Sequence, residues 1–336
     1  MKKISVLLVV CMVLMILPVH GLFAQGQKES VEKKPVIAFS IMDFSIDFLV
    51  ELLASARKTA DELGVDLVDY NSQFDTVKQL NNIEDAIAQR VDCLLLHPVE
   101  SSAVVPGVLA ANDAGIPVVA VDIQPTKGDL ACFVASDNTS IGKYAAEEVV
   151  KYLLNKNGVE AGKVVILGND MISSMRLRKV GVLEVFSAYP GIVVVDTHDF
   201  ATKLDTTIEV TENVLQKYGE GSLDMIIALN STQAIGANAV VSSSKRFDVS
   251  LMGIDKDIDI LNAIIDEKST LIGTVVQSPF DMGRIAVEQC VKIINGESID
   301  QVFFEAPIKV VTKDNVQDYL KYSKELDEIL APYKVK

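Results

Sequence analysis

The sequence lacks the residue patterns that most metal, nucleotide and hydrolytic sites require. Beyond position 24 its only histidines are His97 and His198, which lie too far apart to suggest a metal motif. No Gly-x-Gly-x-x-Gly or Gly-x-Ser-x-Gly stretch occurs, and Gly158–Lys163 is one residue too short for a phosphate loop. The sequence therefore predicts no catalysis, no cofactor and no metal site.

Basic residues and paired cysteines are also scarce. Lysine and arginine total 31 against 46 aspartates and glutamates, a formal net charge of −15. Nucleic acid and anionic membrane surfaces are poor partners for such a chain. Cys93, Cys132 and Cys290 are an odd number with no disulfide or zinc spacing. We expect buried free thiols, although the sequence alone leaves their state open.

The one long hydrophobic run lies at the N-terminus. Two lysines precede the apolar stretch Ile4–Leu17, which is shorter than the ~20 residues that a membrane-spanning helix needs. A cleaved secretory signal over 1–24 is therefore predicted, with cleavage after Ala24 or, as a second choice, Gly21; an uncleaved anchor is the alternative. Cleavage after Ala24 removes two lysines and no acid, so the charge of −15 becomes −17. We expect a soluble periplasmic protein with a disordered lead-in over 25–35.

What the sequence does contain is a repeated alternation of strand-like and helical patterns. The gaps carry helical patterns such as Phe48–Leu63, which stops at Gly64. Spacing near 30 residues is typical of right-handed β-α-β units. An α/β fold with two Rossmann-like lobes, each a parallel sheet with helices on both faces, is predicted. The strand-like runs begin near Val36, Asp66, Asp92, Pro117, Lys163, Ile192, Asp224 and Val249.

The length beyond the leader suits two domains of ordinary size. We expect an N-terminal lobe over 36–137 plus 277–305 and a C-terminal lobe over 138–276 plus 306–314. A helical tail over 315–336 closes the chain. Asp137, Asn138 and Gln277 are the predicted hinge residues, and the apolar segment Phe303–Val311 is expected to be one strand.

Several of the predicted strands end in a polar residue. Ligands of open parallel sheets bind beyond the carboxyl ends of the strands, where the loops diverge. These residues therefore mark a candidate ligand cleft. They are Asp43, Asp122, Asn169, Asn230, Asp255 and Gln277.

Short motifs in a fixed order carry a family resemblance over nearly all of Val36–Asn315. The chain resembles periplasmic sugar-binding proteins of the ribose and galactose type, which share their fold with LacI-type repressor cores. The resemblance implies two lobes on a three-segment hinge (a type I periplasmic binding protein), a ligand between the lobes and delivery to an ABC permease. We expect a monomer that binds a sugar or polyol. The motifs are Asp61–Gly64, His97-Pro98, Ser101–Val104, Ala114–Val118, Ala135–Asn138, Met252–Asp255 and Ile308–Asn315.

The resemblance also implies which residues bind the ligand. Asp122 matches the carboxylate that accepts bonds from sugar hydroxyls, and Arg176 matches an arginine that forks onto ligand oxygens. Phe48, and second to it Phe200, match aromatic residues that cover a sugar ring. The alternatives are a turn or helix cap for the aspartates and ordinary core for Phe48. Second-lobe and hinge contacts are matched by Asn230, Asp255 and Gln277.

The first-lobe loops depart from the ribose-type pattern. Ile123 stands where a ribose pocket has arginine, Met42 and Ile46 replace polar positions, and Asp43 is a carboxylate without counterpart. A ligand hydroxyl buried against this wall would be unpaired, at about 1 to 3 kcal/mol. A deoxy sugar, a polyol or another small hydroxylated molecule with one apolar face therefore fits better than ribose or glucose.

Two further side chains leave alternatives open. His97, at a strand end, either touches the ligand or caps a loop. Arg178 is two positions from Arg176 on a predicted helix, so we expect it to face solvent.

The sequence lacks the features that two other classes of protein require. A secreted enzyme would need a nucleophile with its base, and a repressor core would need a DNA-binding helix-turn-helix before Val36, where only the leader stands. A ligand receptor that signals to a chemotaxis or sensor-kinase partner, with a furanosyl signalling molecule as ligand, stays open beside the transport function. The sequence does not identify the ligand.

Overall fold

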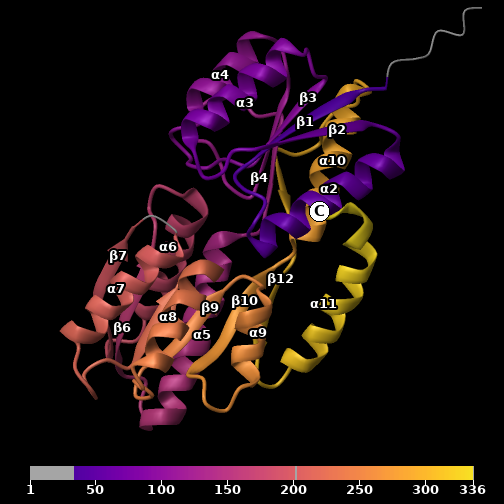
Figure 1. The fold of residues 1–336 in the computed structure, drawn as a ribbon. Coiled ribbons are helices and arrows are strands. Elements are labelled where there is room, and N and C mark those ends of the chain that lie inside the picture. Colours follow the sequence, from indigo (N-terminus) through magenta and orange to yellow (C-terminus); the bar gives the residue numbers. More distant parts are fainter. Residues whose placement is uncertain (1–33, 201–202, 336) are drawn as a thin grey trace, which may run out of the picture. The chain divides into compact units, whose positions relative to one another are not determined.

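The structure, a computed structural model, describes residues 34–200 and 203–335. The predicted signal peptide and most of the lead-in lie outside the described residues. The chain forms two six-stranded sheets, each covered by helices (Figure 1). This is the two-lobed α/β architecture that the spacing predicts. No helix in the described ranges has both the length and the apolar character needed to span a membrane.

The first sheet has the strand order β11-β5-β4-β3-β1-β2, and all its pairings are parallel. Its strands are β1 Val36–Ile41, β2 Asp66–Asn71, β3 Cys93–Leu96, β4 Val118–Val121, β5 Cys132–Ala135 and β11 Phe303–Glu305. Its helices are α2 Asp47–Leu63, α3 Thr76–Ala88, α4 Val105–Asp113 and α10 Pro279–Ile294. The predicted helix end at Gly64 is confirmed, since Gly64 caps α2 in the left-handed conformation.

The second sheet has the order β12-β10-β9-β8-β6-β7, and only β12 is antiparallel. Its strands are β6 Gly162–Gly168, β7 Ile192–Asp199, β8 Met225–Ala228, β9 Ser250–Ile254, β10 Leu271–Gln277 and β12 Ile308–Thr312. Its helices are α5 Asn138–Asn157, α6 Ser173–Phe186, α7 Leu204–Lys217, α8 Ser231–Ser243 and α9 Ile258–Ile265. Helix α11 Val316–Leu330 and the short η1 Ala331–Tyr333 follow β12.

The chain passes between the lobes three times, after β5, after β10 and after β11. The prediction of one strand over Phe303–Val311 is wrong. Phe303 pairs with Phe133 in the first sheet, whereas Ile308 pairs with Gln277 in the second. The crossing lies at Ala306-Pro307, where Ala306 is buried and Pro307 is exposed.

The three cysteines beyond the leader are buried and free, as expected. Cys93 and Cys132 lie in strands of the first sheet, and Cys290 lies in α10, which packs over that sheet. Burial raises the pKa of Cys132 to about 12. Because the thiolate is the reactive form, the Cys132 thiol is an inert packing group.

Helices α5 and α6 approach each other closely through two glycines. A Cβ atom on Gly142 would lie 1.9 Å from the carbonyl oxygen of Arg178, and one on Gly181 would lie 2.1 Å from that of Thr139. Both distances are far below van der Waals contact with rigid backbone. The glycines therefore fix the position of α6 against α5.

Replacing Gly181 with alanine should destabilise the protein by about 2 kcal/mol, because the methyl group forces the helices apart. A loss of stability in this variant points to the close helix contact, since Gly→Ala inside a helix ordinarily stabilises. Gly219→Ala is the matched control, because a Cβ there meets nothing within 4 Å. Urea unfolding monitored by circular dichroism measures both. Equal stability of the two variants would contradict the close approach.

Candidate functional site

A cavity of about 160 Å³ lies at the carboxyl ends of strands from both sheets. A cavity of roughly 150 Å³ holds a benzene-sized molecule, so this space suits a ligand with a single small ring or a short chain. Twenty residues line it: Met42, Ile46, Phe48, Leu49, Phe74, His97, Val99, Glu100, Asp122, Ile123, Asn169, Ile172, Ser174, Met175, Arg178, Lys203, Asn230, Ser231, Asp255 and Gln277.

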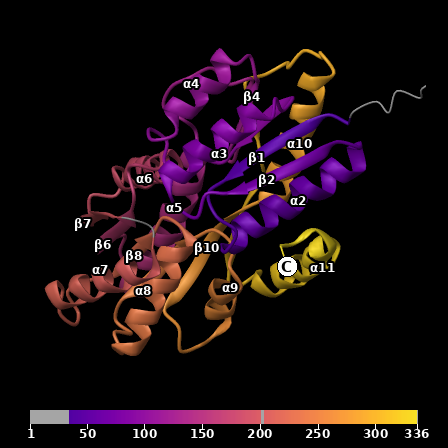
Figure 2. The same ribbon diagram turned by 45° about the horizontal axis from the view of Figure 1, so that its top comes forward.

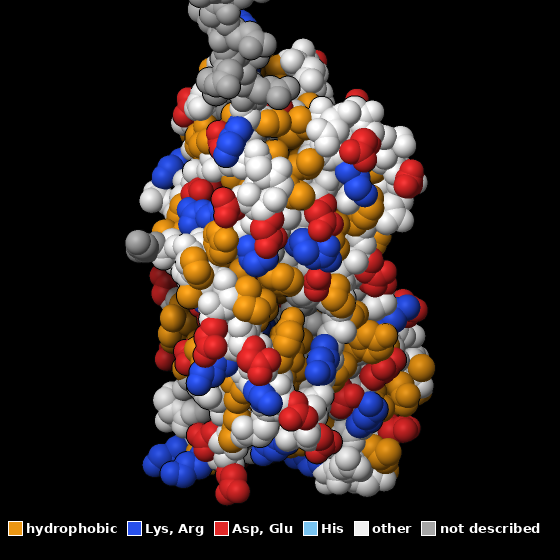
Figure 3. Space-filling model, turned by 90° about the vertical axis from the view of Figure 1, so that its right-hand side faces the viewer, with side chains coloured by type: hydrophobic (Ala, Val, Ile, Leu, Met, Phe, Trp, Pro, Cys, Tyr) orange, Lys and Arg blue, Asp and Glu red, His pale blue; other side chains and the backbone are white. Residues whose placement is uncertain are grey.

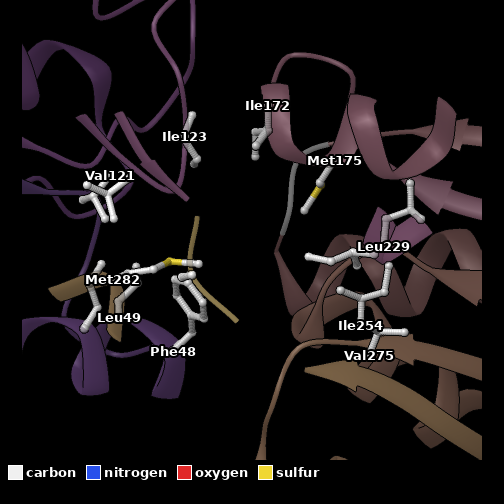
Figure 4. Close-up of a cluster of buried hydrophobic side chains, with 14 of the residues drawn as sticks. Phe48, Leu49, Val121, Ile123, Ile172, Met175, Leu229, Ile254, Val275 and Met282 are labelled. Carbon is white, nitrogen blue, oxygen red and sulfur yellow. The ribbon is translucent and has the colours of Figure 1, made fainter. Parts of the chain in front are cut away.

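The first lobe contributes most of the apolar wall. Figure 4 shows Phe48, Leu49 and Ile123 on one side of the opening, with Ile172 and Met175 of the second lobe across from them. Phe48 and Leu49 stand in the first turn of α2. Most of the first-lobe surface that a ligand contacts in this cavity is therefore apolar.

Asp122 and His97 bring polar atoms to this apolar wall. Asp122 follows β4 with a φ of 62°, in the left-handed region that aspartate tolerates better than most residues. Its Oδ2 lies 3.2 Å from Nε2 of His97, which is itself 2% exposed. Oδ1 of Asp122 and Nδ1 of His97 are buried and have no partner within the described residues. Buried polar atoms ordinarily bind something, so these atoms are available to a ligand.

The second lobe supplies a polar wall built around Asp255. Asp255 follows β9 and, like Asp122, has a positive φ, of 79°. Gln277 Nε2 donates to its Oδ1 over 2.6 Å, and Arg178 Nη1 lies 3.4 Å from its Oδ2. Burial raises the pKa of Asp255, while the charge of Arg178 and the bond from Gln277 act in the opposite direction. The Asp255 carboxylate thus has Arg178 and Gln277 as partners on one side and faces the cavity on the other.

Arg178 was misjudged from the sequence, because it is 2% exposed and lines the cavity. Its Nε donates to Asn138 Oδ1 over 2.9 Å and its Nη1 to the carbonyl of Leu229 over 2.7 Å. The buried side of α6 carries Met175 and Arg178, so Arg176 falls on the exposed side of the helix. Arg176 donates instead to the carbonyl of Asp170, outside the cavity.

Two other predicted contacts also lie away from the cavity lining. Asp43 is buried, but its Oδ1 accepts from the backbone N–H and the hydroxyl of Ser45, which makes it a loop cap. Phe200 packs half-buried against the second-lobe core. The other predicted ligand residues line the cavity together, namely Met42, Ile46, Phe48, His97, Asp122, Ile123, Asn230, Asp255 and Gln277.

The predicted hinge residues lie at two of the crossings. Asp137 caps α5 by accepting from the backbone N–H groups of Thr139 and Ser140. Asn138 is 4% exposed and holds Arg178, so it links the first crossing to the site. Gln277 ends β10 at the second crossing.

Several lining residues were not singled out from the sequence. Leu49, Phe74 and Val99 add apolar surface, and Ser174, Ser231 and Lys203 add polar groups. The only signal that could have found them is their place in the chain, because each lies in a segment next to the end of a strand. Within 34–200 and 203–335 no cluster of three or more potential metal ligands occurs.

Loops of the two lobes touch beside the cavity. The N–H of Ser173 donates to the Ser101 hydroxyl over 3.1 Å, and the N–H of Gln124 donates to the Ser173 hydroxyl over 3.0 Å. Both bonds join the first lobe to the start of α6. The structure therefore shows a conformation in which the lobes enclose the cavity.

Comparison with known proteins identifies the family. A family model described as "Periplasmic binding protein domain" matches residues 37–298. The chain belongs to the periplasmic binding protein family. A ribose import binding protein of Bacillus subtilis is 31% identical over 291 residues, which cover 87% of this chain and 92% of that protein. The suspected family is thus confirmed, and with it the assignment to a family of non-enzymatic transport receptors.

Solved structures of family members match the whole two-lobed fold. An ABC transporter solute-binding protein from Mycobacterium smegmatis with bound glycerol is 28% identical, with a TM-score of 0.78 and coverage of 85% of this chain and 96% of that one. A solute-binding protein from Bacillus halodurans with bound myo-inositol is 26% identical, with a TM-score of 0.76 and coverage of 85% and 97%. These family members were solved with small polyhydroxylated molecules bound.

Proposed function

We propose that this periplasmic binding protein captures a small neutral sugar, deoxy sugar or polyol by lobe closure and delivers it to an ABC permease. The observation that carries the proposal is the enclosed cavity in which His97, Asp122 and Gln277 each present a buried polar atom without a partner in the described residues. Hydroxyl groups can both donate and accept, so they satisfy such a mixed set.

The division of the cavity into two walls supports a ligand with unlike faces. Hydroxyls directed at the second lobe meet Asn230, Asp255 and Arg178, whereas the opposite face meets Phe48 and Ile123. Ribose-type recognition would need an arginine at the position of Ile123. A deoxy sugar or a polyol that can turn its carbon chain toward the first lobe is the better match.

Closure follows from contacts to both walls. A ligand that touches Asp122 in one lobe and Asp255 in the other has its full set of contacts only when the lobes are together, so it shifts the equilibrium toward closure. Transport is favoured over signalling by the relative named as an import binding protein. We further propose that the protein acts as a monomer in the periplasm after cleavage at Ala24.

The experiment that tests this function is a thermal-shift panel of neutral sugars, deoxy sugars, polyols and nucleosides, with charged amino acids as controls. The protein is purified without refolding, and any retained molecule is released for mass spectrometry. We expect stabilisation by one or more hydroxylated compounds, recovered chemically unchanged. Stabilisation by charged solutes alone, or recovery of an altered molecule, would contradict the proposal.

A further inference from the structure

The C-terminal helix α11 packs with its two halves in different lobes. Near its start, Val316 and Tyr319 belong to the hydrophobic core of the second lobe, with Ile260 and Leu261 of α9. Figures 1 and 2 both show α11 lying beside α9 and α2. Helix α2 is part of the first lobe, so α11 contacts both lobes beside the second and third crossings.

The far half of α11 is anchored in the first lobe by a separate cluster. Leu326 and Leu330 pack on Ala54 of α2, together with Phe280 of α10 and Tyr333 of η1. Leu330 is fully buried. This cluster is separate from the core that holds Tyr319, so the helix has one hydrophobic attachment in each lobe.

Polar bonds fix the end of the chain to α2. Arg57 Nη1 donates to the carbonyl of Tyr333 over 2.9 Å, and the same guanidinium is held by both oxygens of Asp69. The Tyr333 hydroxyl lies 3.4 Å from Asp61. These bonds strengthen the attachment of η1, and with it of α11, to the first lobe.

An ion pair crosses between the lobes beneath α11. Glu51 of α2 binds Lys256, which directly follows the cavity residue Asp255; Glu51 is buried and Lys256 is half-buried. Tyr319 and Tyr322 of α11 border the same small cavity as Glu51. On the face around α11, side chains of both charge signs are interspersed with apolar ones (Figure 3). The strap defined by α11 and η1 thus covers a buried contact between the lobes.

We propose that α11 and η1 form a strap that limits how far the lobes open without ligand. A helix of 15 residues is about 22 Å long and stiff, so opening requires its first-lobe attachment to detach. A receptor held near its closed form has a larger binding-competent fraction, and its apparent affinity rises with that fraction. Such a strap regulates ligand binding at the proposed site, and its proposal rests on the lobe closure proposed for that site.

The test detaches only the first-lobe end of the strap. The double variant Leu326→Glu, Leu330→Glu places charges against Ala54 and leaves Val316 and Tyr319 in the second-lobe core. Ile329→Glu is the matched control, because Ile329 lies on the same helix but is 54% exposed. A chain that ends at Asp314 removes the strap altogether and serves as the second variant. Small-angle scattering of each ligand-free protein is the main measurement.

We expect the double variant and the truncated chain to have a larger radius of gyration than the parent and the Ile329→Glu control. If the closed fraction falls tenfold, affinity for the best compound of the thermal-shift panel falls about tenfold. Circular dichroism and equal scattering of all ligand-bound forms establish that the variants are folded. Ligand-free scattering identical to the parent in both folded strap variants overturns the proposal. This readout needs no ligand, so its outcome is distinct from failure of the proposed function.

Discussion

Replacing Arg178 with methionine is expected to abolish ligand binding and to destabilise the protein by about 3 to 5 kcal/mol, since it leaves a buried carboxylate without its cation. Three partners lose the guanidinium at once, namely Asn138, the carbonyl of Leu229 and Asp255. Denaturant unfolding and isothermal titration measure the two effects. Arg178→Lys keeps the charge without the planar fork, so it should retain stability better than affinity.

Arg176→Met is the matched control for this experiment. Arg176 lies two positions away on the same helix and is exposed, and its guanidinium donates to the carbonyl of Asp170. Its replacement should leave affinity and stability nearly unchanged. The reverse outcome, with binding lost in Arg176→Met and kept in Arg178→Met, would restore the assignment made from the sequence.

The penalty of Arg178→Met should also depend on pH. Burial already raises the pKa of Asp255, and loss of the arginine raises it further because the opposing charge is gone. A carboxyl whose folded-state pKa exceeds its unfolded value destabilises above that pKa, and the penalty disappears as the pH falls through it. The stability difference from the parent should therefore be smaller at pH 5 than at pH 8. Adding Asp255→Asn should remove this dependence.

Replacing Asp122 with asparagine should weaken ligand binding about 30- to 100-fold, which corresponds to the loss of one charge-assisted hydrogen bond at roughly 1.5 to 3 kcal/mol. Asparagine keeps the size of the side chain and tolerates the left-handed backbone at this position. It exchanges an acceptor for a donor where Oδ1 is buried and free in the described structure. Stability without ligand should change little, so the loss is specific to binding.

Asp43→Asn provides the comparison, because Asp43 has the same exposure of 7% and also follows a first-lobe strand. Its Oδ1 is occupied by Ser45, and it does not line the cavity. Titration calorimetry with the best compound of the panel should give parent-like affinity for this variant. Equal losses in both variants would show that Asp43 is a ligand residue as first predicted.

The strand ends could be predicted because they follow from local patterns. Asp122 and Asp255 were found as polar stops after fully buried strands, and the topology of parallel sheets brings such stops to one edge. Period and spacing also predicted helices, with α2 observed over Asp47–Leu63 where Phe48–Leu63 was expected.

The errors arise where tertiary contacts override local pattern. Nothing in the sequence near Arg178 shows that its guanidinium donates a hydrogen bond to Asn138, 40 positions earlier. The break of the predicted strand Phe303–Val311 into two is likewise invisible locally, although the predicted lobe boundary fell within this segment, because both halves are strands and only their partners differ. Phe200 has the residue type of a ring-stacking contact, but its backbone directs it to the second-lobe core.

The three crossings have a consequence for how this chain matures. The first sheet acquires its outermost strand, β11, and its covering helix, α10, only from residues 279–305, which follow the whole of the second sheet except β12. A nascent chain that stops short of Pro279 has only α2 to cover the face of the first sheet on which Met282 and Cys290 pack. Completion of the first lobe therefore requires residues that are synthesised after most of the second lobe.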